Sequence, residues 1–401
     1  MKRVVTLLLL DPERALLGAL EPFEPIHPWW QELSDVQAHV RQRWALELSV
    51  LRLVETELAR PPGGAVTYLA QLARSERTLP RLAAIAPELA RRALEPHPLR
   101  APWAEPDGPS TSIAWARREL AARGHRLLCA EQQRAWNLSA IWRLPCHDGS
   151  TFWLKQVPPF FAQESSVLRW LAQHAPGLTT PIVTADEQGR QLLADIPGAD
   201  RYGCPAPERA AFGQQLHAVQ RTALSELDAL AQRGIPDLRG PGLASFIRRW
   251  LSTSGADLSA ARPLLDTLEA RIAALAACRL PDTLVHGDFH PGNVRSNGER
   301  SVILDWTDAF LGHPAFDILR LCEGCSESDA APLIAAWSAR WQTLEPASDP
   351  ARAIQLARPL AALRNSAVYA SFLAQIEPSE HEFHADHVPA WLALATKLDS
   401  A

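Results

Sequence analysis

The sequence predicts an α+β fold in three parts: a small α/β domain, a lobe built on a small antiparallel sheet, and a mostly helical lobe. Three observations indicate this order. Strand-like apolar runs recur up to about residue 200, and helical periodicity dominates beyond it. A proline-rich stretch at residues 95–110 separates the first strands from the rest. With 401 residues and 47% hydrophobic content, the chain can bury more than one core. We therefore expect parts at residues 1–95, 96–124, 125–200 and 201–401.

The first part mixes strand-like runs at Val4–Leu10, Leu48–Val54 and Ala65–Ala73 with helix-like runs at Asp35–Trp44 and Pro80–Leu94. The order of a strand, a helix and two further strands loosely resembles a Nudix-type fold. It lacks the R-E-x-x-E-E cluster that would hold a metal on the helix. A structural or ligand-sensing role is therefore expected for this part, and not hydrolysis.

Residues 96–124 are expected to form a proline-rich linker followed by a helix. The helix would begin near Ser110–Ser112, where hydroxyl groups can cap free amides, and end before Gly124. The prolines of the linker are Pro96, Pro98, Pro102, Pro106 and Pro109.

The remaining chain changes from strands to helices. Asp148-Gly149 supplies a hairpin turn, and one helix is expected at Gln163–His174 before the last strand of the sheet. The expected strands are Leu127–Ala130, Trp136–Leu144, Thr151–Val157 and Gln191–Ile196. The expected helices of the second lobe are Glu208–Leu230, Leu243–Leu251, Leu258–Ala277, Asp329–Trp341, Ala351–Ala374 and His387–Ala395.

Composition excludes several classes of partner. A net charge of −5 and a pI of about 6.2 indicate neither a nucleic-acid nor an anionic-membrane partner. Six scattered cysteines suit a reducing cytoplasm, and the lone Cys322-x-x-Cys325 offers too few ligands for zinc. No apolar run approaches the ~20 residues of a membrane span, and the run after Arg3 breaks at Asp11-Pro12 with no cleavage site. We expect a cytoplasmic protein of open oligomeric state.

The stretch from 286 to 308 carries the strongest functional signal. It reads His-Gly-Asp-Phe-His-Pro-Gly-Asn, and eight residues later an apolar run ends in Asp-Trp-Thr-Asp. Asp288 can orient a hydroxyl group, while the Asn293 amide and the Asp305 carboxylate supply the oxygen ligands that Mg²⁺ prefers. This spacing is what phosphoryl transfer from a metal nucleotide needs.

These residues resemble the aminoglycoside phosphotransferase and choline kinase superfamily, which has His-Gly-Asp where protein kinases have His-Arg-Asp. The resemblance covers roughly residues 125–390 and implies a bilobal protein-kinase-like fold. It also implies ATP or GTP as co-substrate, Mg²⁺, and transfer of the γ-phosphate to a hydroxyl of a small polar molecule. In such a site His286 supports the catalytic loop and His290 makes a structural hydrogen bond. Asp308 and Asp317 brace loops and a helix start.

The sheet lobe contributes a second set of residues. Lysine occurs at positions 2, 155 and 397 alone, so Lys155 is the only one away from the chain ends. It resembles the strand lysine that contacts the α- and β-phosphates, with Glu164 as its ion-pair partner, although nine residues is a short separation. The expected first hairpin, Ala135–Ile141, has no glycine, so the side chain of Ser139 or Asn137 would approach the phosphates instead. The base would lie at the hinge after Leu192–Ile196.

The sequence does not identify the molecule that accepts the phosphate. An aminoglycoside-like antibiotic, a polar metabolite, or choline or ethanolamine would each suit the superfamily. Protein phosphorylation is disfavoured because no Ala-Pro-Glu segment follows Asp305. A catalytically quiet, nucleotide-binding sensor is the alternative from another class.

Overall fold

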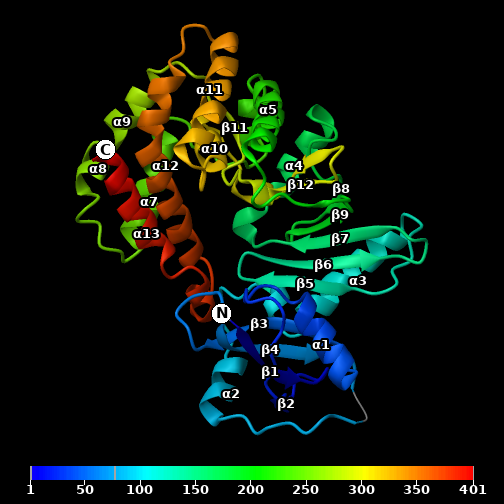
Figure 1. Cartoon of the computed structure of the whole chain (residues 1–401). Helices are drawn as coiled ribbons and strands as arrows, with labels where there is room; N and C mark the ends of the chain where they lie inside the picture. The colour runs from blue at the N-terminus through cyan, green and yellow to red at the C-terminus, as the bar shows by residue number, and fades with distance from the viewer. Residues whose placement is uncertain (1, 76–77, 401) are drawn as a thin grey trace. The chain divides into compact units, whose positions relative to one another are not determined.

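The structure is a computed structural model that describes residues 2–75 and 78–400 (Figure 1). The chain divides into two compact units. The first unit comprises Met1–Phe160, Val183–Asp195 and Gln375–Asp386, and the second comprises Phe161–Ile182, Ile196–Ala374 and His387–Ala401. Sheets and many helices confirm the predicted α+β class. The four-part division at residues 95, 124 and 200 stays a prediction.

The first unit begins with a four-stranded sheet of order β2-β1-β4-β3, in which β1 and β4 run parallel. Its elements are β1 (Arg3–Leu10), β2 (Leu16–Ala19), α1 (Ser34–Trp44), β3 (Leu48–Thr56), β4 (Gly64–Leu72) and α2 (Pro87–Leu94). Leu7 and Leu9 of β1 share a core with Val36 of α1, whereas Leu8 packs with Ala93 of α2. Because side chains alternate along a strand, the two helices lie on opposite faces of the sheet.

A second, five-stranded sheet of order β5-β6-β7-β9-β8 follows. Its strands are β5 (Glu131–Trp136), β6 (Ser139–Pro145), β7 (Thr151–Gln156), β8 (Ile182–Ala185) and β9 (Arg190–Ala194), preceded by η1 (Pro102–Ala104) and α3 (Gly108–Ala121). Trp142 and Leu154 of this sheet belong to the same core cluster as Leu7 of the first sheet. Trp103, within the proline-rich stretch, is also fully buried there. The part of the stretch at Trp103 and Ala104 is therefore packed into the core that the two sheets share.

Several predicted elements differ from the observed ones in this unit. The strand expected at Leu127–Ala130 does not form, because Leu128 is 58% exposed and only Leu127 makes a bridge. Of the expected strand Trp136–Leu144, the residues from Ser139 lie in β6 and Trp136 ends β5, whose other residues were not expected to be a strand. The sequence did not predict β2 and β8, and the helix expected from Pro80 begins only at Pro87.

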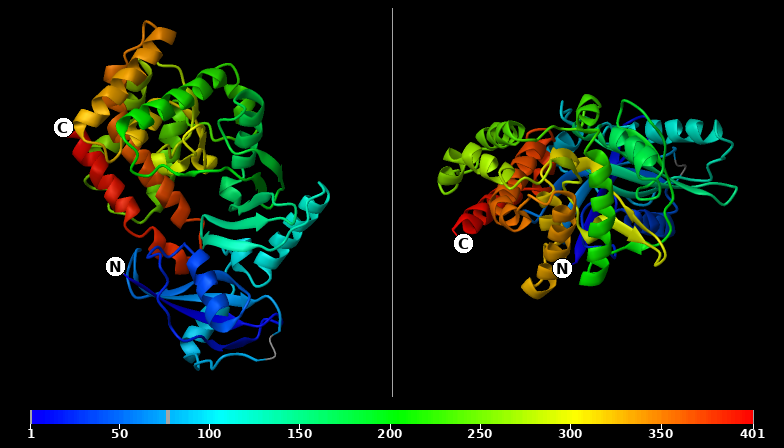
Figure 2. Two further views of the ribbon diagram at one scale, coloured as in Figure 1. Left: turned by 45° about the vertical axis from the view of Figure 1, so that its right-hand side comes forward. Right: turned by 90° about the horizontal axis from the view of Figure 1, so that it is seen from above.

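The second unit is mainly helical. Its helices are α4 (Glu164–His174), α5 (Ala206–Ala223), α6 (Leu227–Gln232), α7 (Pro241–Thr253), α8 (Arg262–Asp266), α9 (Leu268–Ala276), α10 (Ala315–Leu321), α11 (Glu327–Leu344), α12 (Pro350–Leu373) and α13 (His387–Asp399). The long α12 packs against α13 and α7, as Figure 2 shows for α13. The helices expected at 208–230 and 258–277 are each divided in two.

Short strands inserted among these helices carry the 286–308 motif. They are β10 (Ala199–Asp200), β11 (Thr283–Val285), β12 (Val294–Ser296), β13 (Ser301–Ile303) and β14 (Phe310–Gly312). β11 pairs with β14, and β12 pairs with both β10 and β13.

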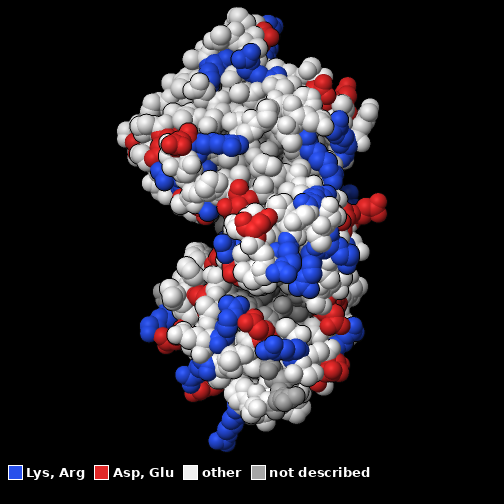
Figure 3. Space-filling model, turned by 90° about the vertical axis from the view of Figure 1, so that its right-hand side faces the viewer, with Lys and Arg blue, Asp and Glu red and all other residues white. Residues whose placement is uncertain are grey.

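The surface carries both signs of charge, and Lys and Arg alternate with Asp and Glu along the face in Figure 3. Within residues 2–75 and 78–400, none of the helices combines the length and the apolar character that a membrane crossing requires.

Candidate active site

The catalytic-loop motif joins the end of one strand to the beginning of another. β11 ends at Val285, and His286 to Asn293 form the loop that leads into β12. In the β12–β13 hairpin Val294 pairs with Ile303, and the backbone N–H of Leu304 donates to the Asn293 carbonyl at 2.8 Å. This register brings the residue before Asp305 beside Asn293. The two expected metal ligands therefore lie at the same end of one hairpin.

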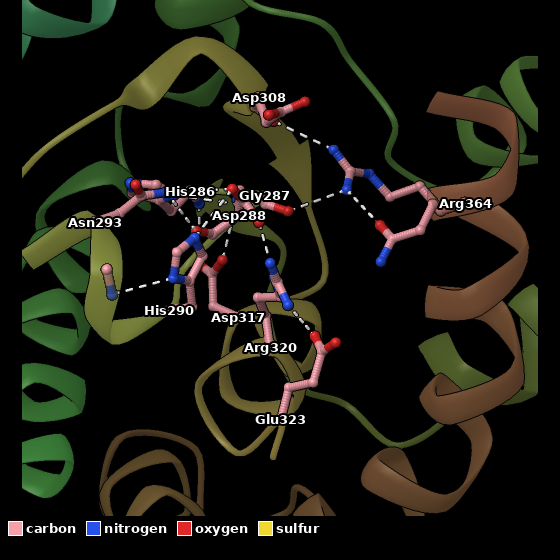
Figure 4. A network of polar contacts seen from close by, with 12 residues as sticks. His286, Gly287, Asp288, His290, Asn293, Asp308, Asp317, Arg320, Glu323 and Arg364 are labelled. Atoms are coloured by element: carbon pink, nitrogen blue, oxygen red, sulfur yellow. Dashed lines mark hydrogen bonds and ion pairs between the residues drawn. The ribbon is translucent and has the colours of Figure 1, made fainter. Parts of the chain in front are cut away.

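Asp288 and Asn293 are in direct contact (Figure 4). The Asn293 side-chain Nδ2 donates to the Asp288 backbone carbonyl at 3.0 Å and to its Oδ2 at 3.2 Å. Since Nδ2 and Oδ1 lie on opposite sides of the amide, these bonds direct Oδ1 away from Asp288. Such an orientation suits an oxygen that ligates a cation.

Asp305 lies in the left-handed region of backbone space, with φ of 59°. This conformation is uncommon for residues other than glycine, and Asp tolerates it better than most. Asp305 follows β13, which ends at Ile303, and directly precedes the short helix at Trp306–Asp308. The Thr307 hydroxyl donates to Asp305 Oδ1 at 2.8 Å, which orients the carboxylate.

His286 contacts both the loop and the hairpin, and its support of a catalytic loop stays a prediction. Its ring is fully buried, and burial lowers its pKa to about 4, so it is neutral near pH 7. Nε2 then donates to the Leu304 carbonyl at 2.9 Å, and Nδ1 accepts from the Asp288 N–H at 3.3 Å. Asp317 accepts from the backbone N–H groups of His286 and Gly287, both at 3.0 Å, so it braces the same loop.

His290 has the structural role that we expect. Its Nδ1 accepts from the Gly292 N–H at 3.0 Å and its Nε2 lies 3.5 Å from Asp288 Oδ2. The ring therefore shapes the turn that leads to Asn293.

Arg320 is a site residue that the sequence reasoning missed. Its Nε donates to Asp288 Oδ1 at 2.7 Å, and its guanidinium also pairs with Glu323. Burial by itself raises the pKa of Asp288, but the hydrogen bond to His290 and the charge of Arg320 outweigh it and lower that pKa. The Asp317-x-x-Arg320 spacing puts both side chains on one side of α10, and this was the available signal.

Arg364, from α12, is a second missed residue and is almost fully buried. It donates to the backbone carbonyls of Gly287 and Asp308, each at 3.2 Å, and its guanidinium lies 4.2 Å from the centre of the Phe310 ring. Gly287 has φ of 84°, and a Cβ there would lie 2.1 Å from the Asp308 carbonyl oxygen. Only glycine fits this position, which is where protein kinases have arginine.

Glu164 and Lys155 fall in different units. Glu164 opens α4, is buried, and accepts from the backbone N–H of Trp306 at 3.2 Å, so it lies beside Asp305. Lys155 is buried on β7, between Ile141 of β6 and Gln191 of β9. Their ion pair stays a prediction.

Ser139 opens β6 and accepts from the Trp136 Nε1–H at 3.1 Å. Its role toward phosphates stays a prediction. Asn137 is the other candidate of this hairpin, and its side-chain amide is hydrogen-bonded to residues of the first unit. Its Nδ2 donates to the Glu380 carbonyl and its Oδ1 bonds to His384. We therefore do not assign Asn137 to phosphate binding.

The donor set fits Mg²⁺ better than a transition metal. Over the described part of the chain, His, Cys, Asp and Glu side chains form no group of three that could hold a metal ion. Mg²⁺ needs only one or two protein oxygens when phosphate and water complete its shell. The Asn293 amide oxygen and the Asp305 carboxylate make such a pair.

Comparison with known proteins assigns the family. A sequence model described as the phosphotransferase enzyme family matches residues 142–353. The chain belongs to this family. Membership makes it an enzyme, a small-molecule kinase, and the match includes the whole 286–308 motif. No curated protein is significantly similar to this phosphotransferase in sequence.

Solved structures show the same fold at low identity. A choline/ethanolamine kinase family protein from Mesorhizobium loti has 18% identity and a TM-score of 0.53, covering 72% of this chain and 95% of its own. An ethanolamine kinase from Plasmodium vivax has 11% identity and a TM-score of 0.52, and the match covers 73% of this chain and 89% of that one. A macrolide 2′-phosphotransferase from Brachybacterium faecium has 20% identity and a TM-score of 0.50, and the match covers 71% of this chain and 98% of that one. The kinase-like fold and the superfamily predicted from the motif are confirmed.

Proposed function

We propose that this phosphotransferase moves the γ-phosphate of ATP or GTP to a hydroxyl of a small polar molecule, an aminoglycoside-like antibiotic or a metabolite. The observation that carries the proposal is the contact between Asp288 and Asn293, with Asp305 at the same end of the hairpin. One carboxylate is then available to orient the acceptor, and an amide with a second carboxylate is available to hold the metal.

Each residue has a physical task in this proposal. Asp288 accepts a hydrogen bond from the acceptor hydroxyl, and its lowered pKa keeps it ionised at neutral pH. A weakly basic carboxylate contributes mainly by orienting the hydroxyl and takes up its proton late in the transfer. Asn293 and Asp305 hold Mg²⁺, which supplies charge neutralisation at the phosphates when bound.

The sheet lobe completes the nucleotide site in the proposal. Lys155 contacts the α- and β-phosphates as a compact point charge, and the Ser139 hydroxyl donates to a phosphate oxygen. Glu164 orients Lys155 and, through its bond to the Trp306 N–H, supports the segment that carries Asp305.

The test is a panel assay of nucleotide-dependent phosphorylation. Purified protein with Mg²⁺ and ATP or GTP is mixed with a macrolide, an aminoglycoside, choline, ethanolamine or homoserine, and nucleoside diphosphate release is measured. Asp288→Ala should lower kcat by about three orders of magnitude without changing the melting temperature by more than a few degrees. The matched control is Asp228→Ala, which removes an exposed carboxylate on α6 of the same unit. Equal turnover of the Asp288 and Asp228 variants would refute the proposed role.

A second candidate is a nucleotide-binding sensor without turnover. The glycine-free β5–β6 hairpin favours it, because the Asn137 amide at the hairpin tip bonds to Glu380 and His384. Slow Mg²⁺-dependent ATP hydrolysis with water as acceptor separates the two: it is expected for the kinase, and its absence together with tight ATP binding supports the sensor.

A further inference from the structure

The chain leaves the second unit between its last two helices. After Ala374 the twelve residues Gln375–Asp386 belong to the first unit, and the chain returns to the second unit at His387. We call Gln375–Asp386 the inserted segment. It contains the short helix η5 (Pro378–Phe383).

The inserted segment is bound to the N-terminal sheet and to the proline-rich stretch. Glu377 accepts from Arg100 Nε and Nη2 at 3.1 and 3.0 Å, and both side chains are about 6% exposed. The Glu380 side chain accepts from the Leu53 N–H of β3 at 3.4 Å. The Phe383 ring packs edge-on against Trp30 at 5.7 Å and belongs to the core cluster of the first unit. Buried pairs of this kind fix position more than they add stability.

The same segment holds the tip of the β5–β6 hairpin. Asn137, at the turn, is 5% exposed, and its Nδ2 donates to the Glu380 carbonyl at 3.1 Å. His384 Nε2 lies 2.9 Å from Asn137 Oδ1 and donates to it, because that oxygen can only accept. The neighbouring Trp136 ring packs against Phe383 at 5.8 Å and His384 at 5.5 Å.

These contacts hold a tip that contains no glycine and in which neither turn residue has a positive φ. A two-residue hairpin turn is most often made by Asn-Gly, Asp-Gly or Gly-Gly, whose backbone adopts the turn unaided. Here Asn137-Leu138 connects β5 and β6, and both ends of the Asn137 amide are fixed by residues more than 240 positions away. A turn without a positive φ matches the twist of its two strands less well, and the inserted segment holds this one through the Asn137 side chain.

We propose that the inserted segment positions the nucleotide-phosphate hairpin, with Asn137 and His384 as positioning residues, and ties that hairpin to the N-terminal domain. The nucleotide part of this inference rests on the proposed function, since the hairpin covers phosphates only if the chain binds a nucleotide. A glycine-rich loop takes its shape on a bound nucleotide, whereas this hairpin is shaped beforehand. The N-terminal domain is thereby part of the nucleotide-binding apparatus.

The experiment uses the full chain and five variants, one of which combines Asn137→Ala with His384→Ala. Asn137→Ala and His384→Ala remove the two sides of the contact, and His384→Gln keeps an N–H donor. Arg143→Ala is the matched control, because it removes only an exposed ion pair with Glu131 on the same hairpin. Amide hydrogen exchange over Glu131–Pro145 reports the hairpin, and ATP hydrolysis with Mg²⁺ reports KM and kcat separately.

The two alanine variants should exchange faster at the hairpin tip and raise KM for ATP about tenfold, with kcat within about twofold. The double variant should resemble Asn137→Ala, because that single variant already loses the contact with His384. His384→Gln should recover most of the slow exchange at the hairpin tip and most of the wild-type KM for ATP. Arg143→Ala should match the wild type in both measurements.

Each contrary outcome is decisive. Unchanged exchange at the tip in folded His384→Ala or Asn137→Ala overturns the inference, whatever the activity. If Asn137→Ala fails to fold, the two His384 variants decide the same point. Faster exchange with an unchanged KM overturns the assignment of this hairpin to the nucleotide. A wild type that neither binds nor hydrolyses ATP refutes the proposed function, and the exchange data still test the positioning of the hairpin.

Discussion

The catalytic loop of the second unit and the β5–β6 hairpin of the first are both held by buried polar contacts, but over very different distances along the chain. His286 bonds to Leu304 and Asp288 to Asn293, at separations of 18 and 5 residues. Asn137 is held by residues 243 and 247 positions away. A site made from near neighbours leaves a readable motif, whereas a site made from distant segments does not. Four changes test whether the two regions differ in this way.

Asp305→Asn should give the largest effect. It keeps the shape and the acceptor for the Thr307 hydroxyl but removes the charge that a metal needs. We expect kcat to fall by about three orders of magnitude, measured by nucleoside diphosphate release. Hydrogen exchange of the β5–β6 hairpin should be unchanged, because Asp305 belongs to the other unit. An altered hairpin would contradict the separation of the two regions.

Asn293→Ala should have the next largest effect. It removes the amide oxygen expected on Mg²⁺ and also the Nδ2 that fixes Asp288. The Mg²⁺ concentration for half-maximal activity should rise about tenfold, and kcat should fall about a hundredfold. Titration of activity with Mg²⁺ checks this, with Asn297→Ala in the turn after β12 as control. An unchanged Mg²⁺ requirement would remove Asn293 from the metal site.

Arg320→Ala tests the electrostatics of the catalytic loop. Arg320 favours the ionised form of Asp288, so its loss should raise the pKa of that carboxyl group. Since the ionised form is the active one, the acid limb of kcat/KM should move to higher pH, by about one unit. The reference is the pH profile of Arg248→Ala, a substitution that breaks the exposed ion pair between Arg248 and Glu269. An acid limb that stays in place would show that Arg320 has only a structural role.

Glu380→Gln should give the smallest effect and concerns the hairpin side. Burial, then the neighbouring Glu377, raises the pKa of Glu380 to about 8. The native state therefore binds more protons than the unfolded state between the ordinary glutamate pKa and about pH 8, and wild-type stability falls as pH rises through that range. Gln keeps the oxygen that accepts from the Leu53 N–H and has no charge to bury.

The melting temperature of Glu380→Gln relative to wild type should thus increase by about 2 °C or more from about pH 5.5 to about pH 8.5. Glu323→Gln, an exposed carboxylate of the second unit, should show no such trend. If the variant instead lost stability relative to the wild type as pH rises, Arg52 and Arg100 would require the charge of Glu380.

Prediction from sequence succeeded where the determinants are local. The fold class and the superfamily follow from periodicity and from motif residues within about twenty positions of one another, and the catalytic role of that motif stays a prediction. The break within the expected helix 258–277 was not predictable, because apolar periodicity continues across it. Arg320 and Arg364 were missed since arginines are frequent in this chain and the two lie on helices that follow the motif.

By itself, the sequence determined the family and the residues that we propose for the chemistry. Asp288, Asn293 and Asp305 are fixed by a short loop and one hairpin, whose geometry depends on spacing and on Gly287, the one residue type that leaves room for the Asp308 carbonyl. Only the tertiary structure decided what surrounds that chemistry. Long-range contacts leave no periodic trace in the chain, so the pairing of Arg320 with Asp288 was visible only after folding. For the same reason, only folding revealed the joining of Gln375–Asp386 to the β5–β6 hairpin and the N-terminal sheet.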